Sequence, residues 1–86
     1  MDWNYFSPYI RLALNSYVSP PFSIVNRVIF DYELLYVKEG EIQVIIGSKT
    51  YKGVKGDIFF FRPREPHTIH FISKPYVHQP HVHFDL

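Results

Sequence analysis

The sequence contains no cysteine, which excludes disulfide bonds and thiolate metal ligands. It also lacks long apolar runs, since none approaches the roughly 20 residues that span a membrane. No basic segment followed by an apolar one marks a secretory signal at its start. A net charge of only +1 gives little attraction for nucleic-acid phosphates. These absences favour a soluble, cytoplasmic domain that contacts no membrane and does not bind DNA by itself.

Aromatic side chains are abundant instead. The 86 residues include eight Phe, seven Tyr and one Trp, and such rings supply large apolar area to a core. A chain of this length forms one domain, and it buries only about 60–65% of its unfolded surface. We therefore expect a single domain over residues 1–86, with an extended or strand-forming segment over residues 1–23 and a barrel core over residues 24–86.

The pattern along the chain is mostly that of β-strands. Residues 10–14 alternate in apolar character and are predicted as a strand, although Ile10 and Leu14 also have the spacing of a helix. A loop containing Pro75 and Pro80 is expected before the last strand. Short strands with frequent turns predict a sandwich or barrel with under about 15% helix. The other predicted strands cover residues 24–30, 32–37, 41–46, 49–52, 58–61, 67–72 and 81–86.

Two segments have a spacing known from a protein family. In residues 31–40, six residues separate Glu33 from Gly40. In residues 56–67, Gly-Asp is followed by a short apolar strand, a proline-containing loop and Pro-His. In this order they resemble the two motifs of cupins. The segments Tyr-Glu-Leu-Leu-Tyr-Val and His-Phe-Asp further resemble the N-terminal sensor domain of AraC-type transcriptional regulators, over roughly residues 27–85.

This resemblance implies a small all-β barrel of the cupin type, also described as a double-stranded β-helix or jelly roll. It implies a non-enzymatic domain that binds a small-molecule effector, a sugar or related metabolite. Binding would be signalled to a C-terminal helix-turn-helix domain, which these residues do not contain and through which alone DNA would be contacted. The alternatives are a stand-alone, metal-dependent cupin enzyme of the isomerase or dioxygenase kind and a structural interaction module.

The sequence departs from metal-binding cupins in the first motif, where they have a His-x-His pair three or four residues before the glutamate. Those positions hold Arg27 and Ile29, or Asn26 and Val28. Only the glutamate and the second-motif histidine remain of the implied ligand set, so we expect no cofactor, no metal and no catalytic residue. The alternative is a metal site formed by the available candidate ligands: Glu33, His67, His81 and His83.

Strand periodicity places Arg27, Ile29, Asp31 and Glu33 on one face if the strand is continuous. The glutamate of cupins points into the barrel, so Arg27 would point inward as well. A buried guanidinium needs an acceptor, which is either an internal carboxylate or a bound ligand. The predicted ligand-binding residues are Arg27, Glu33, His67, His81, Ile29 and Phe71.

Self-association is also expected. The aromatic content exceeds what one small core hides. The face formed by Tyr32, Leu34 and Tyr36 is expected to pack on residues 10–14 or on a partner chain. Residues 81–86 are predicted to be a free strand edge that can pair with a second chain. Together these features predict a homodimer.

Overall fold

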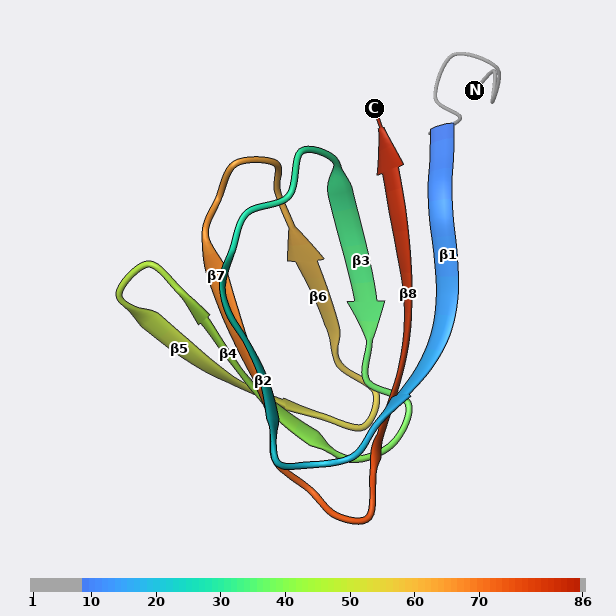
Figure 1. The fold of residues 1–86 in the computed structure, drawn as a ribbon, viewed down its shortest axis with the longest axis vertical. Coiled ribbons are helices and arrows are strands. Elements are labelled where there is room, and N and C mark those ends of the chain that lie inside the picture. Colours follow the sequence, from blue (N-terminus) through green and yellow to red (C-terminus); the bar gives the residue numbers. More distant parts are fainter. Residues whose placement is uncertain (1–8, 86) are drawn as a thin grey trace.

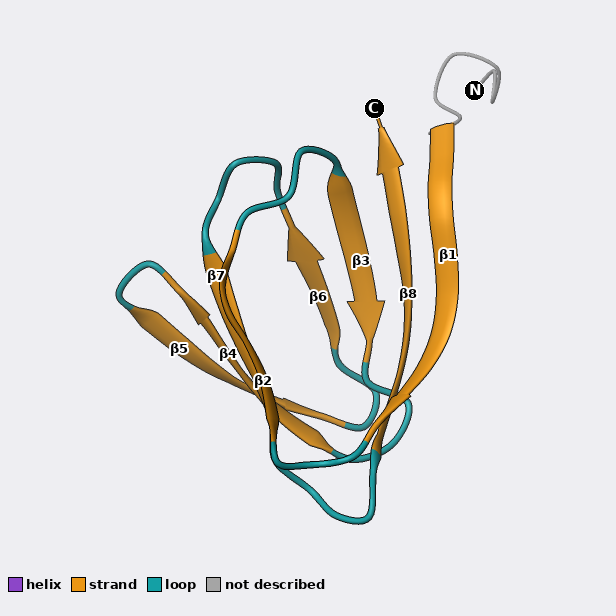
Figure 2. Ribbon diagram, in the orientation of Figure 1, coloured by secondary structure: helices purple, strands orange, loops and turns teal. Residues whose placement is uncertain are grey.

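The computed structural model describes residues 9–85, which form eight strands and no helix (Figures 1 and 2). The all-β prediction is confirmed, and residues 10–14 lie within a strand. Within this range no helix is long and apolar enough to cross a membrane. The strands are β1 (Tyr9–Val18), β2 (Phe22–Arg27), β3 (Tyr32–Tyr36), β4 (Glu41–Ile46), β5 (Lys49–Val54), β6 (Ile58–Phe61), β7 (His67–Phe71) and β8 (Val77–Asp85).

The strands form two four-stranded antiparallel sheets. The first sheet has the order β1-β8-β3-β6 and the second has the order β2-β7-β4-β5. The chain changes sheet at every connection except the β4–β5 hairpin. Figure 1 shows the two sheets facing each other, so that the inward side chains of both form one interior.

The core lies between these sheets. On β4, Ile42 and Val44 are completely buried, and the next residue in each direction is more exposed. This alternation is the strand periodicity visible in the sequence. On β6, Phe61 points inward and is completely buried, whereas Phe60 points outward and remains 43% exposed. The triple-phenylalanine strand therefore supplies rings to both of its faces.

The turn after β3 requires a glycine. Gly40 has a φ of +94°, and a Cβ at this position would lie 2.6 Å from the Ser73 hydroxyl oxygen. That hydroxyl accepts a hydrogen bond from the Glu41 N–H at 2.7 Å. Any other residue would be strained and would displace this contact. The spacing between the first-motif glutamate and its glycine thus has a local structural cause.

The last strand is not a free edge, and that prediction is wrong. β8 lies between β1 and β3, with His81 opposite Leu14 on one side and opposite Leu35 on the other. β8 also begins at Val77, so Pro80 lies within the strand and not in the expected loop. The pairing of β8 with β3 ends at His81. Pro80, which has no N–H, therefore does not have to donate a hydrogen bond to β3. Leu86 lies outside the described residues.

The strand predicted over residues 24–30 ends at Arg27. Asn26 has a φ of 48°, and the register with β7 shifts between Ile24 and Arg27. The chain then passes to the other sheet before β3 begins. The prediction that strand periodicity places Arg27 and Glu33 on one face of a continuous strand is therefore wrong. They belong to opposite sheets, β2 and β3.

The outer face of the first sheet is apolar. Tyr32 stacks on Phe60 and Phe84, with ring centroids 5.5 and 5.7 Å apart. Leu34 and Tyr36 are each 38% exposed on the same strand. Part of the predicted Tyr32 face is thus covered by neighbouring rings, and part of it remains accessible.

Candidate functional site

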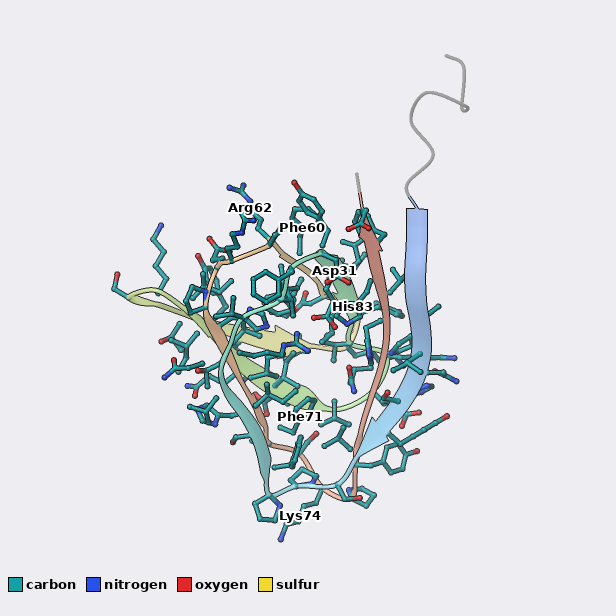
Figure 3. The ribbon with its side chains drawn as sticks, turned by 45° about the horizontal axis from the view of Figure 1, so that its top comes forward. Asp31, Phe60, Arg62, Phe71, Lys74 and His83 are labelled. Carbon is teal, nitrogen blue, oxygen red and sulfur yellow. The ribbon has the colours of Figure 1, made fainter. Side chains whose placement is uncertain are left out.

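A cavity of about 300 Å³ lies between the two sheets. Most of its wall is apolar, and Phe71 is among the lining residues (Figure 3). Polar groups come from β1, β2, β3 and β8. They are Ser16, Arg27, Glu33, Gln79 and His81. Four of the six predicted ligand-binding residues therefore line one cavity: Arg27, Glu33, Phe71 and His81.

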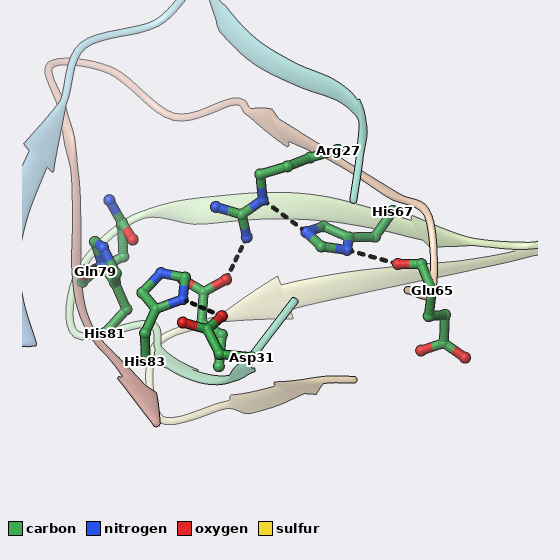
Figure 4. A network of polar contacts seen from close by, with 8 residues as sticks. Arg27, Asp31, Glu65, His67, Gln79, His81 and His83 are labelled. Carbon is green, nitrogen blue, oxygen red and sulfur yellow. Dashed lines mark hydrogen bonds and ion pairs between the residues drawn. The ribbon is translucent and has the colours of Figure 1, made fainter. Parts of the chain in front are cut away.

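The centre of the site is an ion pair between opposite sheets. Arg27 Nη2 donates to Glu33 Oε1, and Arg27 Nε donates to His67 Nε2 at 2.9 Å (Figure 4). Glu33 is only 1% exposed, so its carboxylate requires such a partner. The guanidinium thus compensates the buried charge and links β2 to β3 and β7.

His67 supports the guanidinium from behind. Its Nε2 accepts from Arg27, so the ring hydrogen is on Nδ1, which lies 3.1 Å from the Glu65 carbonyl oxygen. The ring also stacks on Phe61 at 4.3 Å. Burial lowers the pKa of His67 below the ordinary 6.5, and the Glu65 carbonyl opposes this effect. The imidazole is therefore a neutral acceptor that orients Arg27.

The structure separates two predicted residues from the cavity. His67 lies outside its wall, next to a different surface depression that includes Asn26 and Thr68. Ile29 belongs to the buried hydrophobic core. Both contact groups that shape the site, but neither lines the 300 Å³ space.

Two histidines of β8 surround the glutamate from its other side. His83 Nδ1 lies 3.0 Å from Asp31 Oδ1, and its Nε2 lies 3.4 Å from Glu33 Oε2. Figure 3 shows Asp31 beside His83. His81 Nδ1 lies 3.1 Å from the Gln79 carbonyl oxygen. The Glu33 carboxylate on β3 is therefore also contacted by His83 on the paired strand β8.

The sequence interpretation missed Gln79. This residue is 4% exposed and lines the cavity. It lies two and four residues before His81 and His83, so strand alternation places all three on one face. The signal was present, but the expected loop around Pro80 concealed it.

The metal position implied by the first cupin motif does not fit this chain. The two remaining groups of that ligand set, Glu33 Oε1 and His67 Nε2, both accept from the guanidinium of Arg27. A cation at that place would meet a permanent positive charge. Glu33 and His67 therefore serve as acceptors for Arg27 and not as metal ligands at the first-motif position.

Two facing antiparallel sheets, with the glutamate of the first motif pointing inward between them, define a small cupin-type barrel. The sequence profile of the Cupin domain family matches residues 31–83, and the chain belongs to this family. No curated protein sequence matches it significantly.

Solved structures share the fold. A predicted oxalate decarboxylase from Thermotoga maritima has a TM-score of 0.79 and 20% identity, over all of this chain and 76% of that one. The Cnp3 cupin domain of Schizosaccharomyces pombe has a TM-score of 0.79 and 14% identity, over 92% of this chain. A Streptococcus pyogenes protein of unknown function has a TM-score of 0.72 and 13% identity, over 81% of this chain. This chain spans 60% of the length of each of the latter two.

Proposed function

We propose that this cupin domain is a non-enzymatic sensor that binds a small hydroxylated or acidic metabolite between its sheets. The observation that carries the proposal is the cavity of about 300 Å³, whose apolar wall is interrupted by a few convergent polar groups. Ligand sites combine apolar walls with a few oriented polar groups in this way. The volume is at the lower end of the roughly 300–1,000 Å³ typical of such sites, which favours a ligand of about the size of a sugar.

Two polar groups of the wall lack protein partners. The side-chain amide of Gln79 makes no hydrogen bond to any described residue, although Gln79 is 4% exposed. The Nη1 of Arg27 is likewise not engaged within the described range. The polar atoms of the Gln79 amide remain accessible from the cavity, because no fully buried side-chain nitrogen or oxygen among the described residues lacks a hydrogen-bond partner. A ligand with hydroxyl or carboxylate oxygens would satisfy both groups.

The wider proposal is a cytoplasmic, homodimeric regulator of the AraC type. Its support is the sequence resemblance over both motifs, together with a cavity that could report ligand binding to an attached domain. DNA would be bound by a C-terminal helix-turn-helix domain outside these residues. A reading frame that continues past Leu86 into such a domain supports this part, and a frame that ends without one overturns it.

A matched pair of glutamine variants tests ligand binding. Sugars and sugar acids are first screened by thermal shift, and hits are titrated calorimetrically. Gln79→Met keeps the side-chain volume but removes the amide, so it should weaken binding by about 1–2 kcal/mol, or roughly 5–30-fold. Gln43→Met makes the same change at a residue outside the cavity wall and should have no effect. The cavity proposal is wrong if no sugar or sugar acid binds, or if Gln79→Met binds as tightly as the wild type.

A further inference from the structure

A cluster of ligand-type side chains lies on the paired strands β3 and β8. Glu33, His81 and His83 each offer one potential metal-ligand atom, and these three atoms lie within 4.8 Å of one another. Glu33 is directly opposite His83 in the ladder, and Leu35 is opposite His81. The three groups therefore project from a short stretch of adjacent, hydrogen-bonded backbone, which holds them more rigidly than a loop would.

Hydrogen bonds orient both imidazoles. The Nδ1 of His83 faces the Asp31 carboxylate at 3.0 Å, and the Nδ1 of His81 faces the Gln79 carbonyl oxygen at 3.1 Å (Figure 4). Both partners are acceptors, so each ring donates from Nδ1. The lone pair of the neutral ring is then on Nε2. Metal-binding histidines typically have this arrangement, in which a carboxylate or backbone carbonyl fixes the tautomer.

We propose that Glu33, His81 and His83 bind a divalent transition-metal ion such as Zn²⁺. Two imidazoles and one carboxylate are a common ligand set for this class of ion, and they leave at least one coordination position open. Glu33 and His81 also line the cavity, so an ion held by them would border that space.

The distances allow such an ion after a small adjustment. Tetrahedral zinc with bonds of about 2.0–2.2 Å keeps its ligand atoms roughly 3.3–3.6 Å apart. His83 Nε2 and Glu33 Oε2 are already 3.4 Å apart, and the widest pair must contract by at most roughly 1.5 Å. Arg27 occupies Glu33 Oε1 and leaves Oε2 for the ion.

This site differs from the first-motif position of metal-binding cupins, with which it shares only Glu33. It also departs from the expectation that no metal is bound, because that expectation rested on the missing histidines of the first motif. The inference does not depend on the sensor function, since the ion alone is the ligand.

The test is calorimetric titration of the chelator-treated domain with Zn²⁺, without organic ligand. The wild type should bind one ion per chain. Asp31→Ala should weaken binding by about 10–100-fold, as expected when the partner of a ligating histidine is removed. His81→Ala and His83→Ala should weaken it more. His70→Ala is the matched control, because His70 bonds Ser23 away from the cluster, and it should bind as the wild type does.

His67→Ala distinguishes this site from the first-motif position and should retain Zn²⁺ binding. Circular dichroism checks that each variant is folded. If a variant does not fold, long-range ¹H–¹⁵N spectra of the wild-type imidazoles decide: Zn²⁺ should shift Nε2 of His81 and His83 and leave the ring of His67 unchanged. The proposal is overturned if the wild type binds no Zn²⁺, if binding survives in the His81→Ala/His83→Ala double variant, or if His67 is the ring that responds.

Discussion

Removing the arginine of the inter-sheet ion pair should strongly destabilise the fold. Breaking a buried pair at one partner typically costs about 3–5 kcal/mol. The Arg27 side chain is 26% exposed, although that of Glu33 is only 2% exposed, so water reduces this cost to about 2–3 kcal/mol. Loss of the hydrogen bond to His67 adds about 1 kcal/mol. For Arg27→Met we expect a total of about 3–4 kcal/mol, from a stability of roughly 4–13 kcal/mol for a domain of this size.

Urea unfolding measures this effect. With a slope of roughly 1–2 kcal/mol per molar, the midpoint of Arg27→Met should fall by about 1.5–4 M. Adding Glu33→Gln removes the buried carboxylate charge that Arg27→Met leaves without its partner. The double variant should therefore regain about 1–2 kcal/mol of stability relative to Arg27→Met, which is a typical coupling energy for residues in contact. Lys52→Met is the control: it breaks the Lys52–Glu41 pair, where Lys52 is 71% exposed, and should leave the midpoint unchanged. Strictly additive effects of the two substitutions would refute the view that Arg27 compensates the buried carboxylate.

Three further predictions concern pH, packing and assembly. Burial lowers the pKa of His67 in the folded protein below the 6.5 of the unfolded chain. Between these two pKa values the unfolded chain binds more protons, so the free energy of unfolding falls as the pH drops below 6.5. His67→Gln should reduce this fall between about pH 7.5 and 5.5 in urea titrations. A Cβ at Gly53 would lie 2.6 Å from the Phe59 ring, so Gly53→Ala should cost about 1–3 kcal/mol in the same assay, and added Phe59→Leu should recover part of it. If the outer face of the first sheet joins two copies, sedimentation should show a dimer that Leu34→Lys/Tyr36→Lys converts to monomer; a wild-type monomer at high concentration contradicts this.

Local sequence patterns predicted several strands well. Residues 41–46 and 58–61 form strands with the expected bounds, because their alternation or apolar character is bounded by clear turn residues. Pattern alone could not reveal that β8 lies inside a sheet. That position depends on pairing with β1, which begins 76 residues before β8 ends, and such long-range pairing leaves no local signal.

The proximity of Arg27 and Glu33 was predicted correctly, but the structural reason given for it was wrong. Arg27 and Glu33 do contact each other, but they do so from opposite sheets and not as neighbours on one face of a single strand. The turn at Asn26, with a positive φ in a residue other than glycine, is the step that the sequence concealed. His67 was expected in the cavity, but it lies behind Arg27 because its Nε2 accepts the guanidinium hydrogen. Motif spacing identified the interacting residues, whereas their arrangement depended on how the two sheets face each other.

The repeated crossing between sheets has a consequence for how this polypeptide reaches its native state. Only the β4–β5 pair joins neighbouring segments of the chain, and β1 cannot acquire its partner until β8 is available. During synthesis, β3 and β6 can pair earlier, but the first sheet cannot be completed until β8 has left the ribosome. Folds dominated by such distant pairings typically fold on the scale of milliseconds to seconds, and unpaired apolar strands are prone to aggregation during that interval.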